Sequence, residues 1–352
     1  MTTDNTAGIH PQLTLLTGAC GLVGSRTLAH LHAKGFNLVA TDIAPPKPGT
    51  LPPGIPFIQA DLTSLADVDR LFDYAAPVAA ANAPPAAYDF PLASTSNPEH
   101  KGTAFDAVVH ISAIAWLAPG RTLDARAWHA NNVVGSYNVL RTAVERGVRN
   151  IVQASSMNAQ GVSYSVPGRN TFDGFPMSED TTRRPVSGGV FLAALADRQM
   201  DPYGLSKHEA EIQADSVALL CPWARIATLR YHFVCEDYAA ARAQVTARDV
   251  FSWVSYDACA RAAECALAAP LAAFGGHEIF HIVAPEIAWE GGLEEGDRGR
   301  EGEGAERPGT VALLARWWPG IPVDTRYWEG NARRGVWTTD KAERVLGWRH
   351  DV

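Results

Sequence analysis

The sequence predicts an α/β fold in which a doubly wound parallel sheet is followed by a smaller C-terminal domain. Short apolar runs alternate with helix-like stretches through the first two thirds of the 352 residues. The runs are continuously apolar instead of alternating with polar residues, which is typical of parallel strands covered by helices on both faces. A glycine-rich turn joins the first run directly to a helix-like stretch, as strand–helix–strand units require.

Six apolar runs are the expected strands of this sheet. They are LTLLTG (13–18), NLVATD (37–42), PFIQAD (56–61), DAVVHIS (106–112), NIVQASS (150–156) and RIATLRY (225–231). From their positions we expect the doubly wound domain to cover residues 10–232 and the smaller domain to cover 233–352.

Three stretches interrupt this rhythm. Residues 77–104 are rich in Ala, Pro, Ser and Asn and are expected to form a long surface loop. Residues 157–202 form a second insertion, which is expected to lie over the functional site of the doubly wound domain. Residues 290–307 hold seven acidic residues, three arginines and six glycines, so that a mobile loop is expected there.

Composition narrows the possible partners to small molecules. The chain is 47% hydrophobic, has a net charge of −8 and contains no lysine-arginine run, which argues against nucleic acid or an anionic membrane as partner. Five cysteines without a CxxC pair fit neither a disulfide framework nor a zinc site, and the histidines show no regular ligand spacing, so no metal is expected. Without a signal-like start or a long apolar run, we expect a cytoplasmic protein.

The glycine-rich turn TGACGLVG indicates dinucleotide binding. Gly18, Gly21 and Gly24 allow a tight turn and let a pyrophosphate approach the backbone at the start of the next helix. The second strand ends at Asp42, eighteen residues after Gly24, where a carboxylate accepts hydrogen bonds from an adenosine ribose and repels a 2′-phosphate. NAD is therefore the expected cofactor, with Leu22 and Val23 of the turn also beside it.

The stretch DPYGLSKHEAE (201–211) places Tyr203 and Lys207 four residues apart at the expected start of a helix. This spacing stacks two side chains on one helical face. By itself, this spacing favours a solvated helix surface over a catalytic pair, because it occurs by chance in many helices.

In their order along the chain, the glycine turn, Asp42, the Ser155-Ser156 strand end and YGLSK resemble the extended short-chain dehydrogenase/reductases, the NAD-dependent epimerase/dehydratase group. Further matches run almost end to end: DLT (61–63), HISAIA (110–115), NNVVGSYNVL (131–140), LRY (229–231) and DKAERVLGW (340–348). The resemblance implies a Rossmann fold, a C-terminal domain that binds substrate, and further NAD contacts from Asp61, Leu62, Ser112 and Ala113. For Asp61 the alternative is a cap on the following helix.

The resemblance also assigns catalytic roles. Ser156 corresponds to the serine that hydrogen-bonds the reacting oxygen, Tyr203 to the general acid/base, and Lys207 to the lysine that lowers the tyrosine pKa and holds the nicotinamide ribose. Asn132 corresponds to the asparagine that helps to orient the lysine. The alternatives are that Ser156 only caps a strand end and that Asn132 only caps a helix.

Departures from the family narrow the chemistry. Dehydratases resemble one another in an Asp-Glu pair after the catalytic serine, whereas Met157 and Asn158 follow here, which disfavours dehydration. Phe233 stands where nucleotide-sugar epimerases have a diphosphate-binding asparagine. The nearest resemblance is to uronate dehydrogenases, in which the arginine equivalent to Arg248 clamps a sugar carboxylate; a surface salt bridge is the alternative for Arg248. Ala115, Met157 and Asn158 replace polar uronate contacts, so another sugar-like alcohol is also possible.

The sequence thus predicts an NAD-dependent oxidoreductase that takes hydride from a secondary hydroxyl or hemiacetal carbon of a sugar or sugar-acid-like molecule. One alternative is an epimerase that keeps its NAD, and another is a non-catalytic dinucleotide-sensing regulator on the same fold. By analogy with the family, helices around residues 127–147 and 203–220 are expected to form a homodimer interface. The tryptophans of the C-terminal part are expected in the core of the smaller domain: Trp289, Trp317, Trp318, Trp328, Trp337 and Trp348.

Overall fold

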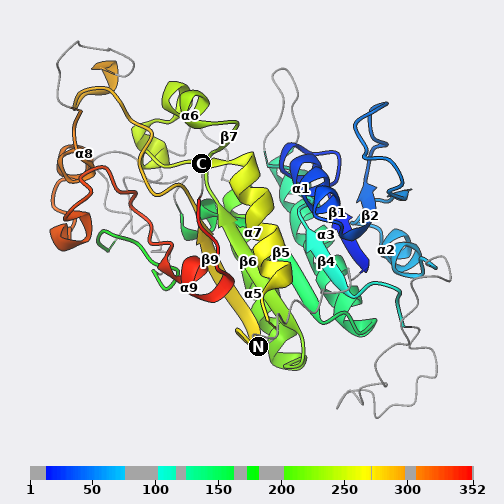
Figure 1. Ribbon diagram of the computed structural model, residues 1–352. Helices are drawn as coiled ribbons and strands as arrows, with labels where there is room; N and C mark the ends of the chain where they lie inside the picture. Colours follow the sequence, from blue (N-terminus) through cyan, green and yellow to red (C-terminus); the bar gives the residue numbers. More distant parts are fainter. Residues whose placement is uncertain are drawn as a thin grey trace, which may run out of the picture.

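A seven-stranded parallel sheet lies at the centre of the protein, in the order β3-β2-β1-β4-β5-β6-β9 (Figure 1). The computed structural model describes residues 13–75, 102–115, 124–161, 173–181, 202–270, 272–297 and 307–350. The strands are β1 (Leu13–Thr17), β2 (Asn37–Asp42), β3 (Phe57–Gln59), β4 (Ala107–His110), β5 (Asn150–Ser156), β6 (Arg225–Tyr231) and β9 (Gly276–Ile282). The predicted doubly wound α/β fold is confirmed. Strand order reverses between β1 and β4, which is where such sheets bind ligands at their carboxyl ends.

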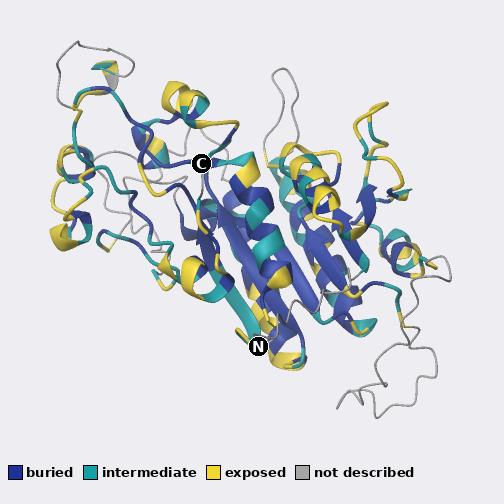
Figure 2. Cartoon of the chain, viewed as in Figure 1, coloured by how far each residue is buried: buried dark blue, intermediate teal, exposed yellow. Residues whose placement is uncertain are grey.

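Helices cover both faces of the sheet, as the apolar strands require. α1 (Leu22–Ala33) and α7 (Tyr256–Ala268) pack on one face. α2 (Leu65–Phe72), α3 (Ala125–Glu145) and α5 (Pro202–Leu220) pack on the other. Every residue of β5 and β6 is buried, whereas the helices expose their outer sides (Figure 2).

A second core lies beyond the carboxyl ends of β5, β6 and β9 and is rich in aromatic side chains. Its short elements include the 3-10 turn η2 (Met157–Gln160), β7 (Val234–Cys235), α6 (Tyr238–Gln244), η4 (Ala247–Asp249), α8 (Thr310–Trp317) and η6 (Thr325–Trp328). Two further short elements are β8 (Val254–Ser255), which pairs with β7, and η5 (Glu295–Asp297). Trp289, Trp318, Trp328 and Trp337 are buried in this aromatic core, and Trp317 packs against it. Trp348 does not belong to it: the residue is buried in the sheet core, where its indole N–H donates to Ala258 O at 3.0 Å.

The predicted boundary at residue 232 does not separate sheet from second core. α7 and β9 follow that position in sequence, yet α7 packs on the sheet and β9 is its last strand. α9 (Asp340–Leu346) also returns to the sheet core through Ala342 and Leu346. The chain therefore crosses between the two cores more than once.

The three predicted loops fall largely outside the described residues. Of 77–104, only residues 102–104 are described. Of 157–202, the structure describes 157–161, 173–181 and 202, and the segment 173–181 docks on the aromatic core through Phe175 and Met177. Of 290–307, it describes 290–297 and 307, so the predicted mobility is not addressed.

Candidate active site

The glycine-rich turn between β1 and α1 has the geometry of a dinucleotide cradle. Gly18 has φ +71°, and a Cβ at this position would lie 2.7 Å from Ser112 N. A Cβ on Gly24 would lie 1.9 Å from Gly18 O, so only glycine allows α1 to start this close to the strand. Gly21 N donates to Gly18 O at 3.0 Å and closes the turn. Leu22, the first residue of α1, is 60% exposed, while Val23 packs against the sheet core.

Asp42 lies at the end of β2 beside this turn. Its carboxylate accepts from Cys20 N at 2.9 Å and from Ile43 N at 2.8 Å, which fixes an anionic group at the edge of the cradle. This position suits the hydroxyls of an adenosine ribose, and the negative charge opposes a 2′-phosphate.

Asp61 does not cap α2, contrary to the alternative considered from the sequence. The cap is Ser64, whose hydroxyl accepts from Asp67 N at 3.3 Å. Asp61 instead accepts from Thr63 N at 2.9 Å and from the Thr63 hydroxyl at 2.7 Å, in the turn before the helix. Its neighbour Leu62 is buried beneath α3, next to Gly135.

The residues after β4 are tied to α5 through Asn132. Its side chain accepts from Ile114 N at 2.8 Å and donates to Ile114 O at 3.0 Å and to the Ser206 hydroxyl at 3.1 Å. Asn132 is thus a buried bridge rather than a helix cap, and it reaches the residue next to Lys207. The same loop places Ser112 against the glycine turn, contributes Ala113 to the lining of a small cavity and leaves Ala115 exposed.

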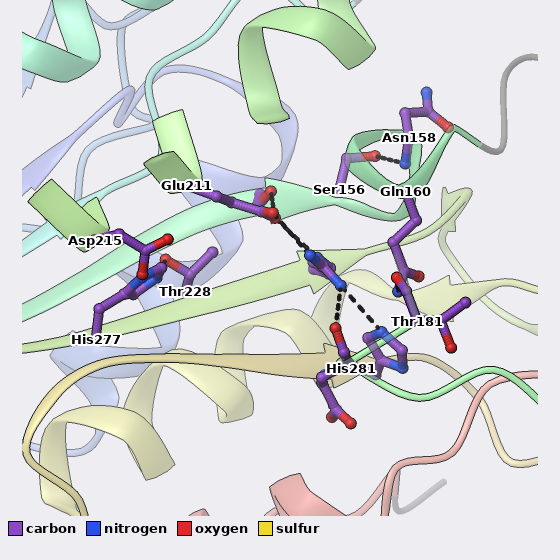
Figure 3. Close-up of polar contacts among 12 residues, drawn as sticks. Ser156, Asn158, Gln160, Thr181, Glu211, Asp215, Thr228, His277 and His281 are labelled. Carbon is purple, nitrogen blue, oxygen red and sulfur yellow. Dashed lines mark hydrogen bonds and ion pairs between the residues drawn. The ribbon is translucent and has the colours of Figure 1, made fainter. Parts of the chain in front are cut away.

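Ser156 is the last residue of β5, and its hydroxyl accepts from Asn158 N at 3.2 Å (Figure 3). A hydroxyl oxygen that accepts from the backbone keeps its proton for another acceptor, such as the oxygen of a substrate. Asn158 is half-buried. Met157 is fully buried in the aromatic core, so it can contribute to a pocket only as a covered residue below the pocket surface.

Tyr203 and Lys207 occupy successive turns at the start of α5, with the Lys207 ammonium 5.8 Å from the centre of the Tyr203 ring. Lys207 Nζ donates to Ala154 O of β5 at 2.7 Å, close to the strand end that carries Ser156. Burial lowers the pKa of Lys207 to about 8, against the opposing effect of Glu211. A cation held next to a phenol favours the phenolate, which a tyrosine base needs.

A small polar cavity adjoins Lys207, and the sequence reasoning missed most of its lining. His110, Asn132, Ser136, Gln153 and Lys207 all face it. Within the described part of the chain, neither amide atom of Gln153 nor the hydroxyl of Ser136 has a hydrogen-bond partner. Buried polar groups are normally paired, so these atoms mark a place for water or for part of a ligand. Gln153 directly follows the apolar residues Ile151 and Val152 of a buried strand, which was the available signal.

His110 is neutral in this cavity. The Thr17 hydroxyl accepts from both Ile111 N at 3.2 Å and Ser112 N at 3.4 Å, which occupies its two lone pairs, so its proton is directed to His110 Nδ1 at 2.8 Å. The ring proton of His110 then lies on Nε2. Burial, together with the nearby Lys207 ammonium, lowers the pKa of His110 to about 3.

The predicted substrate residues Phe233 and Arg248 lie on two segments that join each other. His232 Nε2 donates to Asp249 O at 2.8 Å, and β7 pairs with β8 in the same region. Phe233, Val250 and Phe251 have φ values of 39°, 50° and 59°, which are strained for residues with side chains. Arg248 is exposed on η4, and the structure brings it to the strained segment without placing it on Ser156 or Tyr203.

The described residues contain neither a cluster of metal ligands nor a membrane-spanning helix. Within the ranges given above, no group of three or more His, Cys, Asp or Glu side chains is arranged to hold a metal ion. No helix in that part of the chain is both long enough and apolar enough to cross a membrane.

These residues fit NAD. The glycine cradle has no room for side chains, Asp42 provides a carboxylate at the ribose position, and polar groups around Lys207 are left for further contacts. Gly18, Gly21, Gly24 and Asp42 would hold the adenosine and pyrophosphate part, and Tyr203 and Lys207 would lie beside the nicotinamide ribose.

Comparisons with known proteins point the same way. The sequence model of the NAD-dependent epimerase/dehydratase family matches residues 14–101 and 99–234. Short-chain dehydrogenase/reductase family 42E member 1 of Mus musculus is 29% identical over 144 residues, which are 41% of this chain. The match spans only 29% of that relative's length.

Three solved structures resemble nearly the whole chain. UDP-glucose 4-epimerase of Thermotoga maritima, solved with UDP-glucose, is 17% identical with a TM-score of 0.57 over 97% of this chain and 94% of that one. MoeE5 in complex with UDP-glucuronic acid and NAD is 22% identical, with a TM-score of 0.55 over 96% and 94%. A mutated uronate dehydrogenase is 18% identical, with a TM-score of 0.54 over 97% and 82%. At these identities the likeness establishes the fold.

Proposed function

Because the chain belongs to the NAD-dependent epimerase/dehydratase family and is an NAD-dependent enzyme of the short-chain dehydrogenase/reductase type, we propose that it oxidises a secondary hydroxyl or hemiacetal carbon of a sugar-like molecule. The family inferred from the sequence is confirmed. The substrate class and the residue roles below are the proposal.

The observation that carries the proposal is the placement of Tyr203 and Lys207. They lie on one face of α5, and Lys207 is fastened to β5 two residues before Ser156. This brings a phenol, an ammonium and a hydroxyl to the carboxyl end of the sheet, on the side of the switch point between β1 and β4.

In the proposed reaction, the Ser156 hydroxyl donates a hydrogen bond to the substrate oxygen and orients it. Tyr203, as phenolate, takes the proton of the substrate hydroxyl, and the Lys207 ammonium stabilises that phenolate and binds the nicotinamide ribose. Bound NAD supplies the hydride acceptor. Asn132 holds the loop after β4 and the residue next to Lys207 in register.

The surroundings support a sugar or sugar acid more than a nucleotide sugar. Phe233 offers no hydrogen bond to a diphosphate, and Arg248, on the adjoining η4, is suited to a substrate carboxylate through its bidentate guanidinium. The bound UDP-sugars of the structural relatives belong to those proteins.

The test is NADH formation at 340 nm with purified protein, NAD and a panel of galacturonate, glucuronate, galactose, myo-inositol and UDP-glucose. The proposal predicts NADH with a uronate or a neutral sugar. If no NADH forms, yet denatured protein releases NAD and UDP-glucose is converted to its 4-epimer, the chain is instead an NAD-retaining epimerase. A protein that binds NAD but converts nothing in the panel would favour the sensing role.

A homodimer through α3 and α5 is the second part of the proposal. The two helices pack side by side and expose large apolar residues: Val134 and Tyr137 on α3, and Ile212, Leu219 and Leu220 on α5. Analytical ultracentrifugation should show a dimer that Tyr137→Glu together with Ile212→Glu converts to monomers; a monomeric wild type would contradict it.

A further inference from the structure

A buried ion pair joins the catalytic helix to the sheet. Arg230 of β6 donates two parallel hydrogen bonds to Glu211 of α5, from Nε to Oε1 and from Nη2 to Oε2, both at 2.8 Å. The side chains are 7% and 5% exposed. Desolvation offsets much of the attraction of such a pair, so stability alone is a weak reason for it to be here.

The pair reaches β5 next to the proposed catalytic serine. The Ser155 hydroxyl donates to Glu211 Oε1 at 2.6 Å, and Ser155 is the register partner of Arg230. Lys207, one turn earlier on α5, donates to Ala154 O. Successive turns of α5 are therefore fastened to successive residues of β5, and the next residue of that strand is Ser156.

On its other side the guanidinium holds the segment 173–181. Arg230 Nη1 donates to Glu179 O at 3.3 Å and to His281 Nε2 at 3.5 Å. The Glu179 carboxylate accepts from His281 N at 3.0 Å, which ties the segment to β9. The guanidinium of Arg230 therefore joins Glu211 to His281, and Figure 3 draws these contacts as dashed lines.

We propose that the Glu211–Arg230 ion pair is a positioning unit: it holds Tyr203 and Lys207 at a fixed place relative to Ser156 and links that placement to the docking of residues 173–181. Neither residue is assigned contact with substrate or cofactor. The inference rests on the proposed function, which gives Tyr203, Lys207 and Ser156 their roles.

A matched control lies one turn further along α5. His277 of β9 contacts Asp215 of α5 at 2.6 Å through Nδ1 and the Thr228 hydroxyl of β6 at 2.8 Å through Nε2. This bridge joins the same three elements without reaching Ser155 or the segment 173–181. A general effect of tying α5 to the sheet should appear in both bridges.

The experiment compares the full-length wild type with Glu211→Met/Arg230→Met, which replaces the pair by apolar side chains of similar volume. Arg230→Lys, which keeps the cation but loses the fork, is the second variant in case the double replacement does not fold. Lys207→Met is the reference and Asp215→Asn the control. Thermal midpoints report folding, and quenching of tryptophan fluorescence by NADH from pH 6 to 9.5 reports binding.

The groups facing Lys207 are Tyr203 and Glu211 on α5 and neutral His110 on β4, and Glu211 is the one that opposes the burial of the ammonium. Because the pKa of Lys207 is about 8, the ammonium that binds the ribose loses its proton near this pH, and wild-type affinity for NADH should decrease as the pH rises through it. The folded double variant should bind NADH about fivefold more weakly at pH 7, with a lower pH midpoint, and Arg230→Lys should lie between it and wild type. Asp215→Asn should bind within twofold of wild type with the same midpoint.

The inference is overturned if Lys207→Met binds NADH more weakly than wild type but the folded double variant keeps the wild-type affinity and pH midpoint. If the double variant does not fold, the same result with Arg230→Lys overturns it. If Lys207→Met itself binds NADH like wild type at every pH, the role given to Lys207 fails, and the inference fails with it.

Discussion

Two polar bridges connect α5 to β6 and β9, and they differ in nearly every physical property. The bridge at the carboxyl end of the strands is a fully buried ion pair, Glu211 with Arg230, which also contacts Ser155. The bridge one turn away joins His277 to the Thr228 hydroxyl and to Asp215, whose side chain is 63% exposed. Figure 3 shows Asp215, Thr228 and His277 apart from Ser156, with Glu211 between them and the strand end.

The difference teaches where this protein places buried charge. Away from the site, a carboxylate remains in contact with water and its partner is an imidazole, so little desolvation is needed. Near the site, two complete charges are removed from water and must satisfy each other. Lys207 is a third buried charge, and within the described residues its ammonium donates to a backbone oxygen, Ala154 O.

Breaking the inner bridge on one side should have the largest effect. Arg230→Met leaves the Glu211 carboxylate buried without its cation, which should cost about 3–5 kcal/mol of unfolding free energy. Urea unfolding measures this, and the double replacement of both partners should recover most of the loss. A single variant less than about 1 kcal/mol below wild type would mean that Glu211 is well hydrated.

Removing the buried charge of Lys207 should stabilise the protein. The folded-state pKa of Lys207, about 8, lies below the value of about 10.4 in an unfolded chain, so folding releases a proton between these two pH values. Below pH 8 the ammonium stays charged in the folded protein, and the full free-energy cost of burying it reduces the stability. Lys207→Met should therefore gain about 2 kcal/mol at pH 7, after the lost hydrogen bond to Ala154 O is allowed for.

That advantage should diminish as the pH rises from 8 to about 10.5, where the unfolded chain also loses its proton. Urea unfolding at pH 7 and pH 10 makes the comparison. If the gain does not change with pH, the pKa of Lys207 is the same in the folded protein as in the unfolded chain.

Breaking the outer bridge at its centre should have a smaller effect. His277→Phe fills a similar space but leaves the buried Thr228 hydroxyl without this partner, at a cost of about 1–2 kcal/mol. NADH affinity should stay at the wild-type level because this bridge does not reach β5. Weaker NADH binding at unchanged stability would show that the outer bridge also positions the site.

Asp215→Asn should have the smallest effect. The carboxylate is mostly exposed, and an asparagine still accepts a hydrogen bond from His277, so the change should be within about 1 kcal/mol. The contact with His277 lowers the pKa of Asp215, so its contribution is present above pH 4 and is lost as the pH falls through the lowered value. Wild type and variant should therefore converge in stability in acid.

The sequence predicted the six strands with continuous apolar runs but not β9. GHEIFHI mixes polar and apolar residues without a regular period, and its first four residues are only half-buried. In the described part of the chain β9 is an edge strand, with β6 as its neighbour. The turn glycines could be identified because their conformational need depends on local sequence. The strain at Phe233, Val250 and Phe251 arises from tertiary contacts, which no local pattern records.

The same limit applies to the site. Tyr203 and Lys207 could be paired from their helical spacing, but the partner of Glu211 is 19 residues away on a strand. A signal existed: Arg230 is a charged residue in a strand whose residues are all buried, and such residues need a partner. Which carboxylate would supply it depends on the packing of α5, and the burial of Met157 also follows only from the fold.

The most direct test of the account is the rate of NAD reduction by Tyr203→Phe on the substrate that the wild type oxidises most rapidly in the panel. The phenylalanine keeps the ring and removes only the proton acceptor. The account predicts a decrease in kcat of about 10²–10⁴-fold with NADH affinity nearly unchanged. A variant that keeps more than about a tenth of the wild-type kcat would show that the face of α5 carrying Tyr203 does not perform the chemistry.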